Sequence, residues 1–505
     1  MNTTNINNLV NSLLRNYETS ELEAKDSSTE LSKDLWRTYS AFANTSGGII
    51  LLGISQSKET NKFLVTGVKN PEKLCAEIFT IAQNKNKVSL NLLENQDVQI
   101  HNINGVQIIS IYVKEAEISQ KPVFLNGEDN YKNVYIRKYE ADCRTTPEEY
   151  RRFIRNSQDN IDGQLLSNYT IDDLDINSIL EFKNIVSTRI PNRNYLQMEN
   201  LDFLTEMGVF QIDRSDHRKA KLTLAGLLFL GKYDAIIQKL PHFHLEYLNK
   251  RCDESIRWKD RVSTGDLDYY NLNLFQFYKI VLEKLKTTID EPFELDERCV
   301  RKSPTELYVA LREALGNVII HADYLDSGSN ILITVEPLFY SFENPGTMKI
   351  SKEQFFTGGK SSPRNNVLIT FFRRMGASER AGSGGKEIYT VVEKNKFRAP
   401  ELDVTLESTS LKLWCAAPEN SYTEYDDNTK TVLLFIKDNY RAQIKDLKSN
   451  TKLSKHYIYK ALSILLDDNI IYVGGEGRAT TYYWNPTAIE RVANAKTISK
   501  LLLGK

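Results

Sequence analysis

The chain has 505 residues, 41% of them hydrophobic, which is enough to bury the cores of roughly two to four domains. Its 65 basic and 66 acidic residues give a net charge of −1, so overall charge does not indicate a nucleic-acid partner and a basic site would have to be local. The five cysteines lie far apart in the sequence. This spacing argues against a zinc ribbon or a disulfide framework and fits a reducing compartment.

The beginning of the chain and its hydropathy predict a cytoplasmic protein with no membrane partner. The opening residues, MNTTNINNLVNSLL, contain no basic segment followed by an apolar run, which is the pattern of a signal peptide. The sequence contains no apolar window of about 18 residues, the length that a membrane-spanning helix needs.

Residues 1–160 are predicted to form a mixed α/β domain. The segment ELSKDLWRTYSAFANT has the apolar spacing of a helix, and IILLGI, VQIISIYV and NVYIRKY have the composition of strands. Thr146 followed by Pro147 predicts the start of a further helix, because threonine caps a helix and proline fits its first turn.

The stretch YETSELEAKD (17–26) contains candidate catalytic groups. In an extended chain Glu23 and Lys25 project to one face, because alternate residues share a face. A carboxylate can hold a divalent ion, and a lysine can neutralise the charge that develops during phosphodiester cleavage. The same pair is also typical of an ordinary solvated surface.

Three segments in order, ETSELEAK, FANTSGGIILLGI and VYIRKYEADCRTTPEE, resemble the Schlafen/AlbA-type domain. The resemblance implies nucleic-acid binding and, in nuclease-active Schlafens, cleavage of tRNA or rRNA by two glutamates and an aspartate. Glu18 and Glu23 match the two glutamates, which makes them candidate ligands of Mg²⁺ or Mn²⁺ beside Lys25. The segment after SGG reads GISQ (53–56), without the aspartate. The metal site is then either incomplete or completed by another acid.

Arg137 and Lys138, in YIRKY, are candidate phosphate contacts with an aromatic residue on either side. The alternative is an amphipathic edge strand. Residues 161–295 form a middle connecting region, in which LTLAGLLFLGK is a buried element, HFHLEYL alternates like a strand and NLNLFQFYKIVLEKLKTTI is an amphipathic helix.

Residues 296–417 are predicted to form a second α/β domain, which begins with REALGNVIIHADY (312–324). Residues four apart share one face of a helix, so Glu313, Asn317 and His321 form a polar stripe. Further on, a helix starting near Lys386 follows a glycine-rich segment. Glycines allow the backbone to approach a phosphate, and a helix N-terminus favours an anion. The glycines in question are Gly382, Gly384 and Gly385.

The order of these segments resembles the GHKL ATP-binding fold of histidine kinases and gyrase-type subunits. REALGNVIIHADY, ENPG, SSPRNN and GASERAGSGGKEI are similar to the divergent GHKL-like domain of bacterial proteins predicted to regulate transcription. The resemblance implies that Asn317 coordinates Mg²⁺ on the phosphates of ATP and that Glu313 orients the attacking water. Glu343 and Gly346 stand where the family has an adenine-reading aspartate and spaced glycines. The alternative is a degenerate fold kept as a structural or dimerisation platform.

Residues 425–490 scan as helix, short helix, turn, helix and hairpin, the order of a winged helix-turn-helix. The exposed face of the third helix would enter a major groove, and the glycine-rich hairpin tip would reach the nucleic-acid backbone. The alternative is a winged helix used for protein contacts. The predicted contacts are Lys455, His456, Tyr459, Lys460 and Arg478.

These patterns predict a multidomain α/β (α+β) protein: a Schlafen/AlbA-like domain, a middle region, a GHKL-like α/β sandwich and a winged helix. The first functional hypothesis is a nucleotide-responsive protein that binds DNA or RNA, with ATP and Mg²⁺ as cofactors, in transcriptional regulation or antiviral defence. The second is a metal-dependent endoribonuclease acting on tRNA-type substrates, and a third is a scaffold with a dead ATP site. Because GHKL domains and winged helices often pair, we expect a homo-oligomer.

Overall fold

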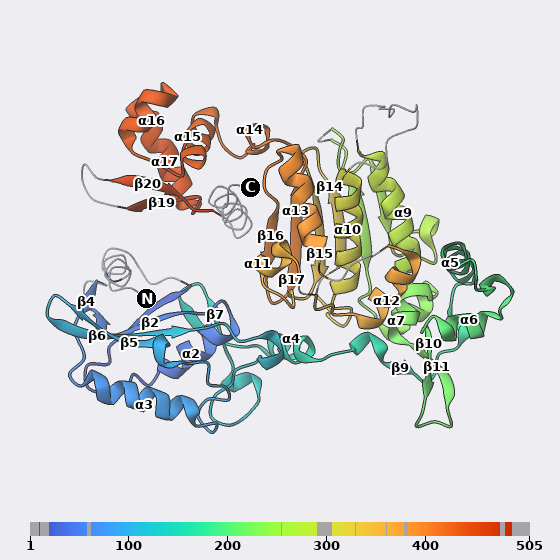
Figure 1. The fold of residues 1–505 in the computed structure, drawn as a ribbon, viewed down its shortest axis with the longest axis horizontal. Helices are drawn as coiled ribbons and strands as arrows, with labels where there is room; N and C mark the ends of the chain where they lie inside the picture. Colours follow the sequence, from blue (N-terminus) through green and yellow to red (C-terminus); the bar gives the residue numbers. More distant parts are fainter. Residues whose placement is uncertain are drawn as a thin grey trace. The chain divides into compact units, whose positions relative to one another are not determined.

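The computed structural model describes residues 10, 20–57, 62–253, 255–289, 306–328, 330–359, 361–377, 382, 384–474 and 480–486. The chain divides into two compact units, Met1–Asp159 and Asn160–Lys505 (Figure 1). Among the described residues, no helix is both long and apolar enough to cross a membrane. Both units combine helices with sheets, which confirms the predicted mixed α/β, multidomain class.

The first unit is built on a four-stranded sheet in the order β1-β2-β6-β5. Strands β1 and β2 run parallel, whereas β6 is antiparallel to both of its neighbours. Helix α2 ends at Asn44, and the turn into β2 passes through a left-handed Gly47 (φ 73°), where a side chain would collide with the Val113 carbonyl oxygen. The bounds are β1 Leu22–Lys25, α2 Leu35–Asn44, β2 Gly48–Leu52, α3 Pro71–Gln83, β5 Val98–Ile103 and β6 Val106–Val113.

Two hairpins and a helix complete this unit. Strands β3 (Ile54–Gln56) and β4 (Phe63–Val65) form one hairpin, and β7 (Tyr135–Lys138) and β8 (Ala141–Arg144) form the other. Helix α4 (Pro147–Ser157) begins where the sequence predicts it. The Thr146 side chain accepts a hydrogen bond from the Glu149 N–H, and the Glu149 carboxylate accepts one from the Thr146 N–H.

The second unit contains a six-stranded mixed sheet in the order β13-β12-β14-β15-β17-β16. Its apolar face belongs to one continuous core that includes Tyr247, Ile333, Phe342 and Leu413. Strand β12 comes from the predicted middle region, yet it pairs in parallel with β14 beyond residue 296. One sheet therefore includes strands from both sides of the predicted boundary at 295/296. The bounds are β12 Leu245–Asn249, β13 Asp260–Ser263, β14 Ile331–Val335, β15 Phe339–Pro345, β16 Glu401–Val404 and β17 Ser408–Trp414.

Helices α9, α10 and α13 run side by side over one face of this sheet (Figure 1). The apolar side of α10 is buried through Leu311, Leu315 and Ile319. Helix α12 packs beside them, and its first free N–H groups, those of Val367 and Leu368, donate to the Asp162 carboxylate at 2.8 and 2.9 Å. The bounds are α9 Leu274–Thr287, α10 Glu306–His321, α11 Lys352–Thr357, α12 Asn366–Met375 and α13 Gly384–Asn395.

The rest of the middle region shares this core. Phe182 of α5, Phe229 of α7 and Phe275 of α9 make edge-to-face ring contacts at centroid distances of 5.3–6.0 Å. A small antiparallel sheet lies at its edge in the order β10-β11-β9. The bounds are β9 Leu165–Leu166, α5 Ile176–Arg189, α6 Asn200–Glu206, β10 Phe210–Asp213, β11 Lys219–Thr223, α7 Leu224–Leu230 and α8 Tyr233–Lys239.

The C-terminal part has its own core and its own three-stranded sheet, in the order β18-β20-β19. Its helices and strands follow one another as the sequence predicts. The winged helix itself stays a prediction, since residues 475–479 at the hairpin tip lie outside the described residues. A short helix, α14 (Pro418–Ser421), precedes it. The bounds are α15 Asp427–Asn439, β18 Arg441–Ala442, α16 Ile444–Thr451, α17 Lys455–Asp467, β19 Ile471–Gly474 and β20 Thr481–Trp484.

Candidate functional site

In the first unit, the predicted catalytic glutamate lies within a buried ion-pair network. Glu23 is 5% exposed. Its Oε1 lies 2.5 Å from Lys25 Nζ, and its Oε2 lies 2.6 Å from Arg137 Nη2. The structure therefore brings Glu23 and Lys25 together, as predicted. It adds a second cation, Arg137, to the same carboxylate.

Arg137 bridges two carboxylates. Its Nη1 donates to Asp142 Oδ1 at 2.8 Å, and the other oxygen of Asp142 accepts from Thr38 Oγ1 at 2.5 Å. Burial tends to lower the pKa of Arg137, but Glu23 and Asp142 outweigh it and raise the pKa above its ordinary value. Asp142 was missed in the sequence, although Arg137 and Asp142 are directly opposed across the tight β7–β8 hairpin.

The described oxygens of this cluster are already occupied by hydrogen-bond donors. A hard cation needs free oxygen ligands. Both oxygens of Glu23 and both of Asp142 already accept from side-chain donors, and a guanidinium stands between the two carboxylates. Within the described part of the chain, no group of three or more His, Cys, Asp or Glu side chains could hold a metal. The predicted ligand Glu18 lies outside the described residues.

The two predicted phosphate contacts of this unit differ from each other. The Arg137 side chain is 1% exposed, so a phosphate could reach it only by displacing a carboxylate, contrary to the expectation of a surface contact. Lys138 is 53% exposed, and its Nζ lies 2.8 Å from Glu149 Oε1. Strand alternation explains the difference, because neighbours in β7 face opposite sides.

In the second unit, the polar stripe of α10 faces the start of α13. Glu313 and Asn317 are half-buried on the same side of α10. A Cβ atom at Gly384, the first residue of α13, would collide with Glu313 Oε1. Gly382, just before it, has a φ of 80°, and its carbonyl oxygen accepts from the Gly359 N–H at 3.1 Å. The Glu313 carboxylate therefore meets glycine backbone at a helix N-terminus, and Asn317 lies one turn further along α10.

These donors fit the phosphates of a nucleotide and a magnesium ion in part. Asn317 offers an amide oxygen, and the glycines permit a close backbone approach at the positive end of a helix dipole. Gly385 does not belong to this group, because it packs against the Phe355 carbonyl, where a Cβ would collide. Its role in the structure is therefore to allow α13 to pack closely.

The predicted adenine contacts divide across the sheet. In β15, Tyr340, Phe342 and Asn344 are buried on the helix-covered side, so the intervening Glu343 points to the opposite face. Asn344, which is 4% exposed, is the polar residue on the helix-covered side. The role of Glu343 as an adenine contact stays a prediction.

Gly346 follows β15 at the C-terminal end of α10 rather than beside Glu313. Its φ is 92°, and a Cβ there would lie 3.0 Å from both Arg364 Nη2 and Asp323 Cβ. Eight residues separate Glu313 from His321, about 12 Å along the helix axis. Gly384 and Gly346 therefore lie near opposite ends of the segment of α10 between Glu313 and His321.

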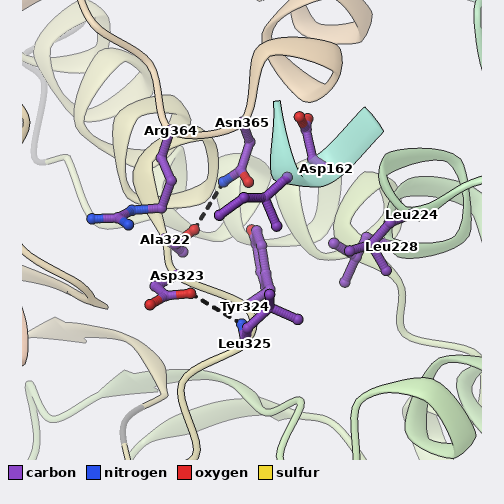
Figure 2. A pocket seen from close by; sticks show the side chains of 10 residues that line it. Asp162, Leu224, Leu228, Ala322, Asp323, Tyr324, Leu325, Arg364 and Asn365 are labelled. Carbon is purple, nitrogen blue, oxygen red and sulfur yellow. Dashed lines mark hydrogen bonds between the residues drawn. The ribbon is translucent and has the colours of Figure 1, made fainter. Parts of the chain in front are cut away.

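The carbonyl groups that end α10 are capped by side chains from the segment before α12 (Figure 2). Asn365 Nδ2 donates to the carbonyls of Ile320 and Ala322 at 2.9 and 2.8 Å, and Arg364 Nε donates to that of His321 at 3.1 Å. A cation at this end also complements the helix dipole. Burial, followed by Arg364 and Lys349, lowers the pKa of His321 to about 4.

In the C-terminal part, the predicted contact face of α17 is exposed. Ile458, Leu462 and Leu465 fill the core beneath it. Lys455 Nζ lies 5.6 Å from the centre of the Tyr459 ring. Arg478 lies outside the described residues. The exposed residues of α17 include Lys455, His456, Tyr457, Tyr459 and Lys460.

Three family models match this chain. Residues 18–146 match the family described as Schlafen, AlbA_2, and residues 328–413 match the one described as the putative ATP-dependent DNA helicase recG C-terminal domain. Residues 151–246 match a domain of unknown function, DUF8451. Helix α10, with Glu313 and Asn317, precedes residues 328–413, the range that matches the recG C-terminal model.

Two solved structures are similar to this chain. The DIP2311 protein from Corynebacterium diphtheriae is 16% identical over 97% of this chain and 99% of its own, with a TM-score of 0.40. The N-terminal domain of a putative ATP-dependent DNA helicase RecG-related protein from Nitrosomonas europaea is 23% identical over 28% of this chain and 92% of its own, with a TM-score of 0.23. Scores this low support no argument about the fold. No protein of curated function matches the chain.

The two described families cover the regions in which the sequence and the geometry placed a carboxylate–cation cluster and a glycine-started helix. The chain therefore contains a Schlafen, AlbA_2 domain at residues 18–146 and an ATPase-like region of the recG C-terminal type at residues 328–413.

Proposed function

We propose that this protein binds a nucleic acid and that nucleotide binding in its ATPase-like domain changes this engagement. The Schlafen, AlbA_2 match supports the first part, and the match to a helicase C-terminal domain supports the second. RNA cleavage is not part of the proposal, because Glu23 is ion-paired with Lys25 and Arg137. The role we assign is transcriptional regulation, since the exposed face of α17 has lysine and tyrosine side chains that suit a DNA groove.

One observation carries the nucleotide part: Glu313, in the polar stripe of α10, meets the glycine start of α13. Asn317 would hold the magnesium ion, and Glu313 would orient a water molecule. The backbone at Gly382 and Gly384 would approach the phosphates, with Gly346 and Asn344 toward the other end of α10. The bound ion would neutralise phosphate charge. Because Glu313 contacts Gly384, its side chain would have to turn as the phosphates enter.

Thermal unfolding with Mg²⁺ and ATP tests this site. A ligand present at ten times its Kd stabilises the folded state by about 1.4 kcal/mol, which raises Tm measurably. We expect this shift in the wild type and its loss in Asn317→Ala. Glu343→Gln is the matched control, because Glu343 points to the opposite sheet face and its variant should keep the shift.

Binding of a labelled promoter duplex, with and without Mg²⁺–ATP, tests the coupling. The wild-type Kd should change with nucleotide, and the Kd of Asn317→Ala should not, because coupling between two sites requires both to be occupied. A Tm shift that survives in Asn317→Ala, or disappears in Glu343→Gln, would place the nucleotide elsewhere and contradict the proposal.

A further inference from the structure

The rim of the ion-pair network in the first unit carries two arginines that the sequence prediction did not name. Arg37, on α2, and Arg144, at the end of β8, are both exposed. Their guanidinium carbons lie 5.9 and 6.0 Å from the ring centre of the same residue, Tyr135. Arg144 Nε also donates to the Tyr135 hydroxyl at 3.2 Å. Two cations from separate elements therefore converge on one aromatic side chain.

The network beneath holds this pair of arginines in place. Thr38, next to Arg37 in the chain, donates to Asp142, which lies two residues before Arg144 in β8. This hydrogen bond ties α2 to the β7–β8 hairpin. Among the described residues, its ion pairs join Glu23 and Asp142 to Lys25 and Arg137. The two rim arginines take no part in these buried pairs and are exposed.

Among the described residues, Asp34 is the acidic partner of Arg37, and it does not block a phosphate. Arg37 Nη1 lies 2.7 Å from Asp34 Oδ1, and the two side chains are 49% and 54% exposed. An exposed ion pair of this kind contributes at most about 1 kcal/mol, so a phosphate can replace it. Lys138 offers a contrast, because its partner Glu149 is buried and also caps α4.

We propose that Arg37 and Arg144, oriented by Tyr135, form the phosphate-binding site of the Schlafen, AlbA_2 domain for the backbone of a nucleic acid. This inference rests on the proposed function and names the contacts that it requires. The planar guanidinium matches phosphate geometry, and an aromatic face restricts the number of orientations that each arginine samples. Arg137, predicted for this task, instead holds the carboxylates that fix the rim.

The test measures the salt dependence of binding by full-length protein. The probe is a labelled single-stranded RNA of about 20 nucleotides in a salt series. Lys455→Gln/Lys460→Gln serves as the background, because it reduces the contribution of α17. Adding Arg37→Gln and Arg144→Gln should lower the slope of log K against log salt by about 1 for each arginine lost. Lys114→Gln, the matched control in the same unit, should leave the slope unchanged, because Lys114 is ion-paired with Glu94 at 2.7 Å. Melting temperatures equal to that of the background show that the variants fold.

The outcomes separate this inference from the proposed function. RNA binding with an unchanged slope in Arg37→Gln/Arg144→Gln overturns the inference and leaves nucleic-acid binding standing. An absence of binding to any RNA or DNA overturns both. A parallel measurement with inorganic phosphate shows whether the two arginines bind a free phosphate rather than the phosphates of a nucleic-acid backbone. If phosphate raises the Tm through these arginines and RNA does not compete, the site serves a free phosphate and the inference is wrong.

Discussion

The buried cluster around Arg137 and the exposed face of α17 contain similar side chains in opposite surroundings. In both regions, basic residues next to aromatic ones predict contacts with phosphate. In the first region the Arg137 side chain is 1% exposed and bonded to Glu23 and Asp142. In the second, Lys455 and Lys460 are open to solvent over an apolar core. Basic residues next to aromatic ones therefore form a buried structural ion pair around Arg137 and a solvent-accessible cationic surface on α17.

The difference shows that burial decides what a cation can do. A buried guanidinium is costly without a partner, so it comes with carboxylates and its loss damages the fold. An exposed lysine contributes little to stability and is free to gain energy from a polyanion. Variants of the two regions should therefore separate stability from binding.

The largest expected effect is that of Arg137→Met. Removing the cation leaves Glu23 and Asp142 buried around an apolar side chain, which should lower the free energy of unfolding by about 3 kcal/mol or more. Urea unfolding measures this loss. Of the four tryptophans, Trp36 alone lies within residues 1–159, so its fluorescence reports on this unit.

A triple variant provides the control for this prediction. Arg137→Met combined with Glu23→Gln and Asp142→Asn should recover most of the lost stability, because the uncompensated charges are removed as well. If Arg137→Met alone were as stable as the wild type, the Arg137 ion pairs would not stabilise the fold. The proposed contrast between the buried Arg137 cluster and the exposed face of α17 would then be wrong.

An intermediate effect is expected for His321 at the end of α10. Its side chain is half-buried, whereas Arg137 is buried and the lysines of α17 are exposed. The pKa of His321 is about 4 in the fold, against 6.5 for an ordinary histidine. Below pH 6.5 the unfolded chain therefore binds a proton that the folded chain does not. Stability should fall as the pH drops from about 6.5 to 4, by up to about 3 kcal/mol. Denaturant unfolding at several pH values measures this change.

His321→Asn is the matched variant. It should lose the part of the pH dependence that lies between pH 6.5 and 4, whatever its stability at neutral pH. An equal slope in the variant and the wild type would mean that other groups cause the low-pH loss and that His321 is not held neutral in the fold.

The smallest effect on stability, with a clear effect on binding, is expected for Lys455→Gln/Lys460→Gln. Surface substitutions of this kind change the free energy of unfolding by about 0.5 kcal/mol or less. Binding of duplex DNA should weaken, and its salt slope should fall by about 1 per lysine. Lys394→Gln on α13 is the control, because Lys394 is also exposed but is ion-paired with Glu306 at 2.6 Å. Equal slopes in both variants would remove α17 from the interface.

Local patterns predicted the secondary structure well where one residue type enforces one conformation. The cap at Thr146, the helix that carries Glu313 and Asn317, and the strand VQIISIYV all lie where the sequence places them. The candidate nucleotide site was also predicted as a pairing of α10 with a glycine-started helix, because helical periodicity fixes which residues share a face.

The sequence gives least information where a shift of one residue along a strand changes the face on which a side chain lies. The structure turns Glu343 away from the helix-covered side of the sheet and buries the side chain of Arg137, a candidate phosphate contact. Composition does not reveal which side of a strand is covered. The sheet of the second unit also includes strands from both sides of the predicted domain boundary at 295/296. Strand β12 finds its parallel partner β14 across more than 80 residues, and sequence proximity gives no sign of such a pairing.

The sequence by itself therefore determined the helices, the strands, the caps and the residues that share a helix face, since these depend on interactions within a few positions of the chain. Only the tertiary structure decided which charges are paired and which are open. Burial sets that distinction: Glu23, Arg137 and Asp142 come from three strands, and the energy of their pairing depends on the water that the rest of the fold excludes.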